Sequence, residues 1–340
     1  MADKDAITKQ YMNDAKIFAD AFNFLLYDGK NVICPSRLRT MDTAEIVLPF
    51  GEGQAASPVQ KYRDNLKYLA AMEDETAAYA ILGLEGQSDI HYAMPVRDML
   101  YDAMQYAKQV EKAAKSHRDA AKAKAEKSWQ DHTGSAVSQK EHTASSGEYL
   151  SGFYKNDRLV PVITLVILFS PKPWDGPMSI HEMLSDVKAE LLPFIPDYRI
   201  NLIAPADMSE ASLDKFNTSL REVLLYIKYS GDKKQLSDLL DKDPHFRELD
   251  TEAAVVINTL TNSKLKFDRK GKTVNMCLAV QAMRQEERQE GRLEGRQEGE
   301  SRINQLNSLL IDLNRFEDLK RAAKDPVYQA ELMAELLPNQ

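Results

Sequence analysis

Apolar residues recur at helical spacing in three stretches of the chain. The first predicted helix spans 13–27, and Asp28-Gly29 supplies the turn that ends it. A second opens at Pro95, since proline is tolerated in the first turn of a helix. The third spans 213–227. The apolar stripe of the second helix consists of Val96, Leu100, Ala103, Ala107 and Val110. We expect each apolar stripe to pack against a core.

Shorter runs rich in β-branched and aromatic residues predict strands. They span 45–48, 77–85, 159–169 and 198–203, whereas 63–69 fits a strand or a helix. The run over 159–169, LVPVITLVILF, is almost entirely apolar. Such a run is typical of a strand that is covered on both faces of its sheet. Helices alternate with buried strands, which predicts an α/β fold.

The pattern changes at Arg284, and from Glu290 a four-residue repeat with almost no apolar residues follows. Gly291, Gly295 and Gly299 recur in it, and each glycine inside a helix costs about 1 kcal/mol relative to alanine. The repeat is therefore either a solvated linker helix that frays or a glycine-lined seam for a partner helix. Apolar positions return beyond it and predict short helices, which can dock on the core or on another subunit and offer a surface for homo-oligomer assembly.

These patterns divide the chain into three parts. We expect an α/β domain over 1–283, a charged linker over 284–302 and a helical segment over 303–340. Within the domain, the stretch 128–150 is rich in Ser, Thr, Gly and His and its apolar residues show no periodicity, which predicts a flexible excursion.

Composition bounds the class of protein. Of the 340 residues, 43% are hydrophobic, which is enough to bury a core. Cys34 and Cys277 lie far apart and predict no disulfide framework. No apolar run approaches the roughly 18–20 residues that span a bilayer, and the polar N-terminus does not resemble a signal peptide, so we expect a cytoplasmic protein without a membrane partner. The net charge of −8 argues against indiscriminate coating of nucleic acid.

Candidate chemistry concentrates near the predicted strand over 77–85. Glu85 and Gln87 are two residues apart, so on a strand they project from the same face, and Gly86 between them leaves the backbone accessible. Asp64 lies at the start of the preceding segment and can converge with Glu85 if the two segments pair. Two carboxylates and a backbone carbonyl make a hard oxygen site, which suits Mg²⁺ or Mn²⁺.

A longer ordered set of residues carries a family resemblance. It comprises KIFADAFNFLLYDG, YRDNLKYL, ILGLEGQSDIHYAMPVRDMLYDAMQYAKQV and LVPVITLVILF, and it extends over most of the first 283 residues. The set resembles the PD-(D/E)XK nuclease family transposases, a group related to the Rpn and YhgA-like recombination-promoting nucleases. The Gly/Glu/Arg-rich tail before a helical C-terminus is also similar to these proteins.

The resemblance implies a restriction-endonuclease-like mixed central sheet flanked by helices, with a helical C-terminal extension. It implies a DNA endonuclease of transposition or recombination, in which a metal-activated water hydrolyses the phosphodiester. Asp64 and Glu85 match the two acidic metal ligands, and Gly86 would supply the carbonyl between them. Gln87, the third expected catalytic residue, stands where the wider superfamily has lysine. Asp14 or Asp20 matches the extra acidic residue of some members.

Two departures from the family pattern leave an alternative open. Arg63 stands where a proline would precede Asp64, and Gln87 lacks the positive charge of the motif lysine. Arg97, Lys67 or a second metal ion could supply that charge. Without it, the chain would be a degenerate nuclease fold that binds DNA or protein and uses its C-terminal helices to assemble.

Other side chains near the motif have two interpretations each. His91 could act as a base or sit idle, and Tyr101 and Tyr106 could touch substrate or simply be half-buried. His117, His132 and His142 lack the spacing of zinc ligands.

Basic residues gather in two places, and either place could be a solvated surface or a contact with DNA phosphates. The expected DNA-binding residues near the motif are Arg97, Lys108, Lys112, Lys115 and Arg118, and the same helix continues with Lys122, Lys124 and Lys127. The second group comprises Lys264, Lys266, Arg269, Lys270 and Lys272.

Overall fold

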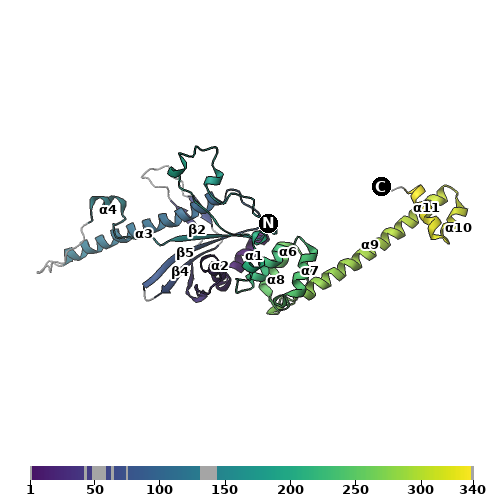
Figure 1. Ribbon diagram of the computed structural model, residues 1–340, viewed down its shortest axis with the longest axis horizontal. Helices are drawn as coiled ribbons and strands as arrows, with labels where there is room; N and C mark the ends of the chain where they lie inside the picture. The colour runs from purple at the N-terminus through teal and green to yellow at the C-terminus, as the bar shows by residue number, and fades with distance from the viewer. Residues whose placement is uncertain are drawn as a thin grey trace. The chain divides into compact units, whose positions relative to one another are not determined.

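The computed structural model describes residues 2–41, 44–47, 59–62, 65–73, 76–130 and 144–337 (Figure 1). The chain divides into two compact units. The first contains Met1–Ser263 and Arg269–Val274, and the second contains Lys264–Asp268 and Asn275–Gln340. The first unit holds the predicted strands and the candidate chemistry.

The first unit is organised around a five-stranded mixed sheet. Its strands, in spatial order, are β1 (Leu38–Thr40), β4 (Asn65–Glu73), β5 (Thr76–Gln87), β6 (Val162–Leu168) and β7 (Asn201–Ile203). β1, β4 and β5 pair antiparallel, whereas β5, β6 and β7 run parallel. The α/β class is thus confirmed, and the ambiguous segment near 63–69 forms a strand. A separate antiparallel pair joins β2 (Ala44–Val47) to β3 (Val59–Tyr62).

β6 occupies the centre of the core, as its apolar sequence predicts. All but one of its residues are buried, and it pairs with β5 on one side and β7 on the other. Leu165 and Ile167 point to one face of the sheet, and the alternate residues Thr164 and Val166 point to the other. Both faces of the strand are therefore covered.

The helix α3 (Met94–Gln130) connects β5 to β6, because parallel strands need a crossover. Pro95 lies in its first turn, as predicted, but the face that packs on the sheet is not the expected apolar stripe. Val96 and Leu100 are 43% and 40% exposed, whereas Met104 is 3% exposed. Among the described side chains of α3, Met94, Pro95, Asp98, Tyr101, Asp102 and Gln105 are buried as well. The prediction was wrong because polar groups on the sheet provide partners for a polar helix face.

Four helices pack together on the opposite side of the sheet: α1 (Ala2–Met12), α2 (Ala15–Tyr27), α6 (Leu220–Tyr229) and α8 (Thr251–Thr261). The predicted helix over 13–27 is confirmed as α2. Its N-cap is Asp14, whose Oδ1 accepts hydrogen bonds from the amides of Lys16 and Ile17, and its C-cap Asp28 adopts the left-handed conformation. Phe18 and Phe22 are fully buried.

The single helix expected over 213–227 is two helices, α5 (Glu210–Leu213) and α6. The chain between them is held by Asp20 of α2, a residue that is 2% exposed. Its carboxylate accepts hydrogen bonds from the amides of Asn217 and Thr218 and from the Thr218 hydroxyl. This long-range contact holds the residues just before α6 outside either helix.

The rest of the first unit consists of short elements. They are α4 (Ser146–Ser151), α7 (Lys233–Lys242), β8 (Leu249–Asp250), β9 (Thr273–Val274) and the 3₁₀ turns Pro35–Arg37, His181–Met183, Leu192–Phe194, Pro205–Asp207 and Pro244–Arg247. The predicted flexible excursion over 128–150 lies partly outside the described residues. Both of its described ends are mainly helical rather than loops. Residues 128–130 belong to α3, and Ser145 and Glu148 form a capping box at the start of α4.

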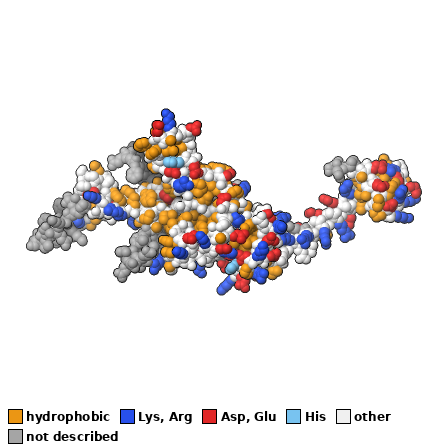
Figure 2. Space-filling model, viewed as in Figure 1, with side chains coloured by type: hydrophobic (Ala, Val, Ile, Leu, Met, Phe, Trp, Pro, Cys, Tyr) orange, Lys and Arg blue, Asp and Glu red, His pale blue; other side chains and the backbone are white. Residues whose placement is uncertain are grey.

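The second unit contains α9 (Met276–Asp312), α10 (Phe316–Ala322) and α11 (Pro326–Leu336). A small core joins them, formed by Leu306, Leu310, Ala322 and Leu332. The expected linker over 284–302 lies within α9, so it is helical throughout, and Figure 2 shows side chains of both charges along this helix. A Cβ atom added to Gly291, Gly295 or Gly299 would meet no heavy atom within 4 Å. The choice between a fraying helix and a seam for a partner remains a prediction.

In the described ranges, none of the helices combines the length and the apolar character that crossing a bilayer requires.

Candidate functional site

Glu85 lies near the carboxyl end of β5, and its side chain is completely buried. It points to the face of the sheet that α3 covers, because Arg97 Nη2, from the first turns of α3, lies 3.0 Å from Glu85 Oε2. The Arg97 side chain is 29% exposed. A buried carboxylate is costly without a partner, and this ion pair satisfies that requirement in part.

Gln87 and Gly86 complete the strand end. Gln87 is half-buried and projects from the same face as Glu85, as their spacing predicts. Gly86 points to the opposite face, where an added Cβ would lie 3.5 Å from the Phe169 ring and 3.9 Å from Thr8. These are ordinary contact distances, so neither space nor a left-handed backbone requires glycine here. Its role as a carbonyl ligand stays a prediction.

The pairing that would bring Asp64 toward Glu85 is confirmed at the level of the strands. β4 and β5 form an antiparallel hairpin in which Asn65 lies opposite Leu84. Asp64 itself, the residue before Asn65, lies outside the described residues, as does Arg63. The second acidic ligand therefore remains a prediction.

The face of α3 that covers Glu85 carries two more buried carboxylates. Asp98 is 0% exposed and Asp102 is 6% exposed. The Thr164 hydroxyl donates to Asp102 Oδ1 at 2.5 Å, and the Tyr198 hydroxyl donates to Asp102 Oδ2 at 2.6 Å. Asp102 thus ties α3 to β6 and to the segment before β7, so its role in this structure is to hold the helix on the sheet.

The two acidic candidates of the predicted first helix, Asp14 and Asp20, have structural roles. Asp14 caps α2 and Asp20 binds the chain before α6. The carboxylates of both are engaged with backbone amides. Neither is brought to Glu85 in the contacts that the structure describes.

The aromatic and histidine candidates near the motif have mostly structural partners. Tyr101 is 4% exposed, and the Arg97 guanidinium lies 5.6 Å from its ring centroid. The Tyr106 hydroxyl accepts a hydrogen bond from the amide of Val162. His91 is half-buried, and its Nδ1 atom has no hydrogen-bond partner among the described residues.

His117 also has a structural role. It stacks on the Tyr154 ring and its Nε2 lies 2.8 Å from Asp157. His132 and His142 lie outside the described residues.

The basic residues on α3 lie further along the same helix. Lys112, Lys115 and Arg118 are exposed, and Lys108 is half-buried. Of the second basic group, Lys266 has an acidic partner, because its Nζ lies 2.6 Å from Glu286. Because Lys112, Lys115 and Arg118 of α3 are exposed, they are available to contact a polyanion.

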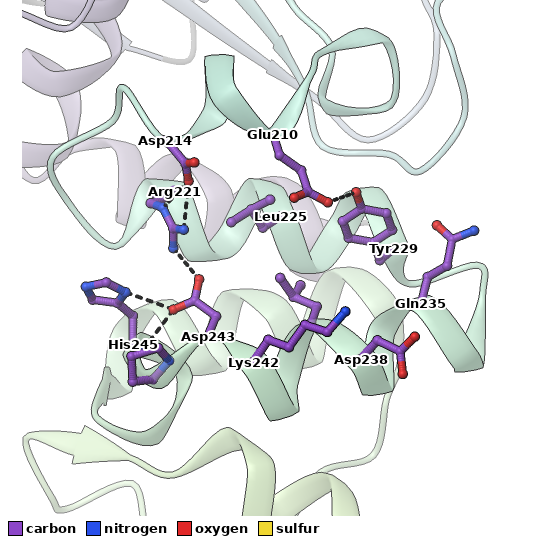
Figure 3. A pocket seen from close by; sticks show the side chains of 12 residues that line it. Glu210, Asp214, Arg221, Leu225, Tyr229, Gln235, Asp238, Lys242, Asp243 and His245 are labelled. Atoms are coloured by element: carbon purple, nitrogen blue, oxygen red, sulfur yellow. Dashed lines mark hydrogen bonds and ion pairs between the residues drawn. The ribbon is translucent and has the colours of Figure 1, made fainter.

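The structure also gathers a polar cluster that the sequence did not suggest. Ligand atoms of Glu222, Asp243 and His245 lie within 4.8 Å of one another. Asp243 and His245 line a polar pocket of about 540 Å³ between α6 and α7 (Figure 3). These residues are close because α7 and the following turn fold back on α6, and no local spacing in the sequence could have indicated it.

Arg221 fills the centre of this cluster. Its Nη1 lies 2.8 Å from Glu222 and 2.6 Å from Asp243, and its Nη2 lies 2.7 Å from Asp214. Figure 3 draws the ion pairs with Asp214 and Asp243. Burial alone would raise the pKa of Asp243, but hydrogen bonds from Arg221 and His245 outweigh burial and lower it. Burial opposes the charged form of Arg221, but its hydrogen bonds to Asp243, Glu222 and Asp214 outweigh burial and raise its pKa. The cluster is therefore an ion-pair network around a fixed cation, which accounts for its carboxylates without a metal.

Comparison with known proteins adds no assignment. No family model, curated protein or solved structure matches this chain. The functional proposal below therefore rests on the chemistry of Glu85 and its neighbours.

Proposed function

We propose that this chain is a metal-dependent DNA endonuclease with a restriction-endonuclease-like fold. The observation that carries the proposal is Glu85, a fully buried carboxylate near the end of a central strand, facing a helix that brings Arg97 to it. The topology supports the proposal, since an antiparallel hairpin is followed by a helical crossover to a parallel strand. An association with transposition or recombination comes from the sequence resemblance.

The residues at this strand end fit a hard divalent cation. The Glu85 carboxylate and the Gln87 amide project from the same face, and both offer the oxygen ligands that Mg²⁺ and Mn²⁺ prefer. Asp64 is the proposed second acidic ligand and Gly86 the proposed carbonyl ligand. When bound, such an ion lowers the pKa of a water and offsets charge on the phosphate.

The proposed reaction is phosphodiester hydrolysis. The attacking water gives one proton to solvent as its oxygen bonds to phosphorus. The bond from phosphorus to one deoxyribose oxygen breaks, and that oxygen takes up a proton from solvent. Gln87 can orient the attacking water through its amide, but it has no charge to offer the phosphate. A cation from elsewhere in the chain must supply it.

The exposed basic residues of α3 are the proposed contacts with the DNA backbone. Lys112, Lys115 and Arg118 follow the catalytic end of the helix, with Lys108 between them and Arg97. In a chain of net charge −8, a local basic face gives a focused contact rather than a general affinity for DNA.

A plasmid-nicking assay with Mg²⁺ or Mn²⁺ tests the proposal, and the chain offers a matched pair of variants. Glu85 and Glu222 are both buried glutamates that pair with an arginine. We expect Glu85→Gln to reduce nicking at least about 100-fold, because a ligand of the metal is lost. Glu222→Gln is expected to retain wild-type nicking, because Glu222 belongs to the network around Arg221.

Two results would contradict the assignment. Equal activity in wild type and Glu85→Gln would remove Glu85 from the reaction. A loss in Glu222→Gln alone would place the metal in the other cluster instead. Melting curves of both variants check that each remains folded.

A degenerate nuclease fold that only binds DNA or protein is the second candidate. It is favoured by the same ion pair, because Arg97 neutralises Glu85 while Gln87 brings no charge. Calorimetric titration with Mn²⁺ separates the two candidates. A degenerate site should bind no divalent ion at millimolar concentration, whereas the proposed enzyme should bind one.

A further inference from the structure

We infer that Arg97 is a catalytic residue of the proposed nuclease. Before the metal binds, Arg97 pairs with the Glu85 carboxylate; afterwards it contacts the scissile phosphate. The inference rests on the proposed function. Gln87 carries no positive charge, and Arg97 would supply that charge to the phosphate.

The two partners of the ion pair differ in their access to solvent. Glu85 is 0% exposed, whereas Arg97 is 29% exposed, at a distance of 3.0 Å between Nη2 and Oε2. The carboxylate is therefore fixed inside the protein, and the guanidinium reaches it from the solvent side. An arginine side chain can leave by rotating about its own bonds, so α3 itself need not move.

Tyr101 offers the guanidinium an additional contact on the same helix. The ring lies four residues, or about one turn, further along α3, and its centroid is 5.6 Å from the guanidinium carbon. Since Tyr101 is 4% exposed, the ring is held in place by the core. The electron-rich face of such a ring attracts a cation, so Arg97 keeps a partner when it releases Glu85.

A divalent ion and Arg97 cannot share Glu85 without repelling each other. A charge of +2 beside a charge of +1 at about 5 Å disfavours joint occupancy by more than tenfold even at the dielectric constant of water. The displaced guanidinium stays near the metal because its backbone is fixed in the first turns of α3. A phosphodiester bound to that metal would then lie within its reach, and arginine binds phosphate oxygens through two parallel hydrogen bonds.

The inference predicts opposite effects of one substitution on metal binding and on cleavage. In Arg97→Gln, we expect Mn²⁺ to bind at least about tenfold more tightly in the absence of DNA, because its competitor is gone. We expect cleavage of plasmid DNA to fall about 100-fold to 1,000-fold, because the charge at the phosphate is gone. A purely structural role would not tighten metal binding.

A matched control exists on α9. Arg296 also pairs with a glutamate, Glu300, at 2.9 Å, but on an exposed helix surface. Arg296→Gln removes the same charge and the same kind of ion pair. We expect it to leave both Mn²⁺ affinity and cleavage unchanged.

Arg97→Lys provides a second variant that keeps the charge near Glu85 and does not depend on Arg97→Gln being folded. Lysine can balance the carboxylate but cannot form the paired hydrogen bonds to phosphate. We expect unchanged Mn²⁺ affinity and a cleavage rate reduced about tenfold, the loss of one charged hydrogen bond. Circular dichroism and melting curves report whether each variant is folded.

The outcomes separate this inference from the proposed function. Full cleavage in Arg97→Gln or in Arg97→Lys overturns the catalytic role of Arg97, as does unchanged or weaker Mn²⁺ binding in Arg97→Gln. In those cases the nuclease proposal stands if the wild type nicks DNA. A wild-type protein that neither binds Mn²⁺ nor nicks DNA overturns the nuclease proposal itself.

Discussion

Buried carboxylates in this protein differ in how their charge is balanced. Glu85 is paired with an arginine that remains partly exposed, whereas Asp102 is bound by two hydroxyl groups from the sheet side. Asp243 shares an arginine with two other carboxylates. Of the three arrangements, only the pair of Glu85 and Arg97 places a fully buried carboxylate against a guanidinium that is 29% exposed.

The lowered pKa of Asp243 makes a prediction about acid stability. A carboxyl whose pKa is lower in the folded protein stabilises the fold above its ordinary pKa of about 3.9, and that contribution is lost as the pH falls through the lower, folded value. Wild type should therefore exceed Asp243→Asn in free energy of unfolding at pH 6, and the difference should shrink below about pH 4. Urea unfolding across this range measures it.

The control for this experiment is Asp186→Asn, which removes the same charge from an exposed site outside the network. A difference between wild type and Asp243→Asn that stays constant down to about pH 2 would contradict the assignment of Asp243 to the Arg221 network.

At the scale of elements, α3 shows why the sequence indicated a helix but not its buried face. Hydrophobic periodicity selects the stripe that contains Leu100, yet the sheet lies against the face that contains Asp98 and Asp102. The polar face is buried because Thr164 and Tyr198 bind the Asp102 carboxylate, and because Glu85 of the strand below pairs with Arg97 of the helix. Those partners come from distant parts of the chain, so periodicity alone cannot identify them.

A pair of substitutions on α3 tests which face is buried. Met104 is 3% exposed and Leu100 is 40% exposed, although both are large apolar residues one turn apart. We expect Met104→Ala to lower the free energy of unfolding by about 2–4 kcal/mol, and Leu100→Ala to lower it by less than about 1 kcal/mol. Urea unfolding of the two variants compares them directly. A larger loss of stability in Leu100→Ala would show that the apolar stripe is the buried face of α3.

Other elements show the same difference between structure set by local sequence and structure set by distant residues. α2, β5 and β6 were predictable because each is defined by its own capping residues or apolar run. The break between α5 and α6 was not, because it is made by Asp20, almost two hundred residues away. Of the candidate site, the sequence indicated Glu85 and Gln87 and offered Arg97 among several cations, but it could not show which cation lies against Glu85.

At the scale of the whole molecule, the net charge of −8 and the basic face of α3 make a joint prediction about DNA affinity. The slope of log affinity against log salt is negative, and each phosphate contact that is lost reduces its magnitude by about 0.9. A variant with Lys112, Lys115 and Arg118 changed to alanine should therefore lose about 2.7 from that slope. Fluorescence anisotropy with a DNA duplex, measured between about 50 and 200 mM salt with Ca²⁺ in place of Mg²⁺, tests it.

The control for this measurement removes equal charge from α9, by changing Arg288, Arg292 and Arg296 to alanine. This variant should bind DNA with the wild-type slope, because its substitutions lie outside the proposed contact face. A reduced slope in the control, or an unchanged slope in the α3 variant, would move the DNA contact away from α3.

The ion pair between Arg97 and Glu85 also bears on how this protein is made. Many metal sites fold only when the ion arrives, because their ligands repel one another until it does. Here an arginine from the same chain already balances the buried glutamate. In the proposed nuclease, folding of the chain would therefore not require the divalent ion, which would be loaded after the chain has folded.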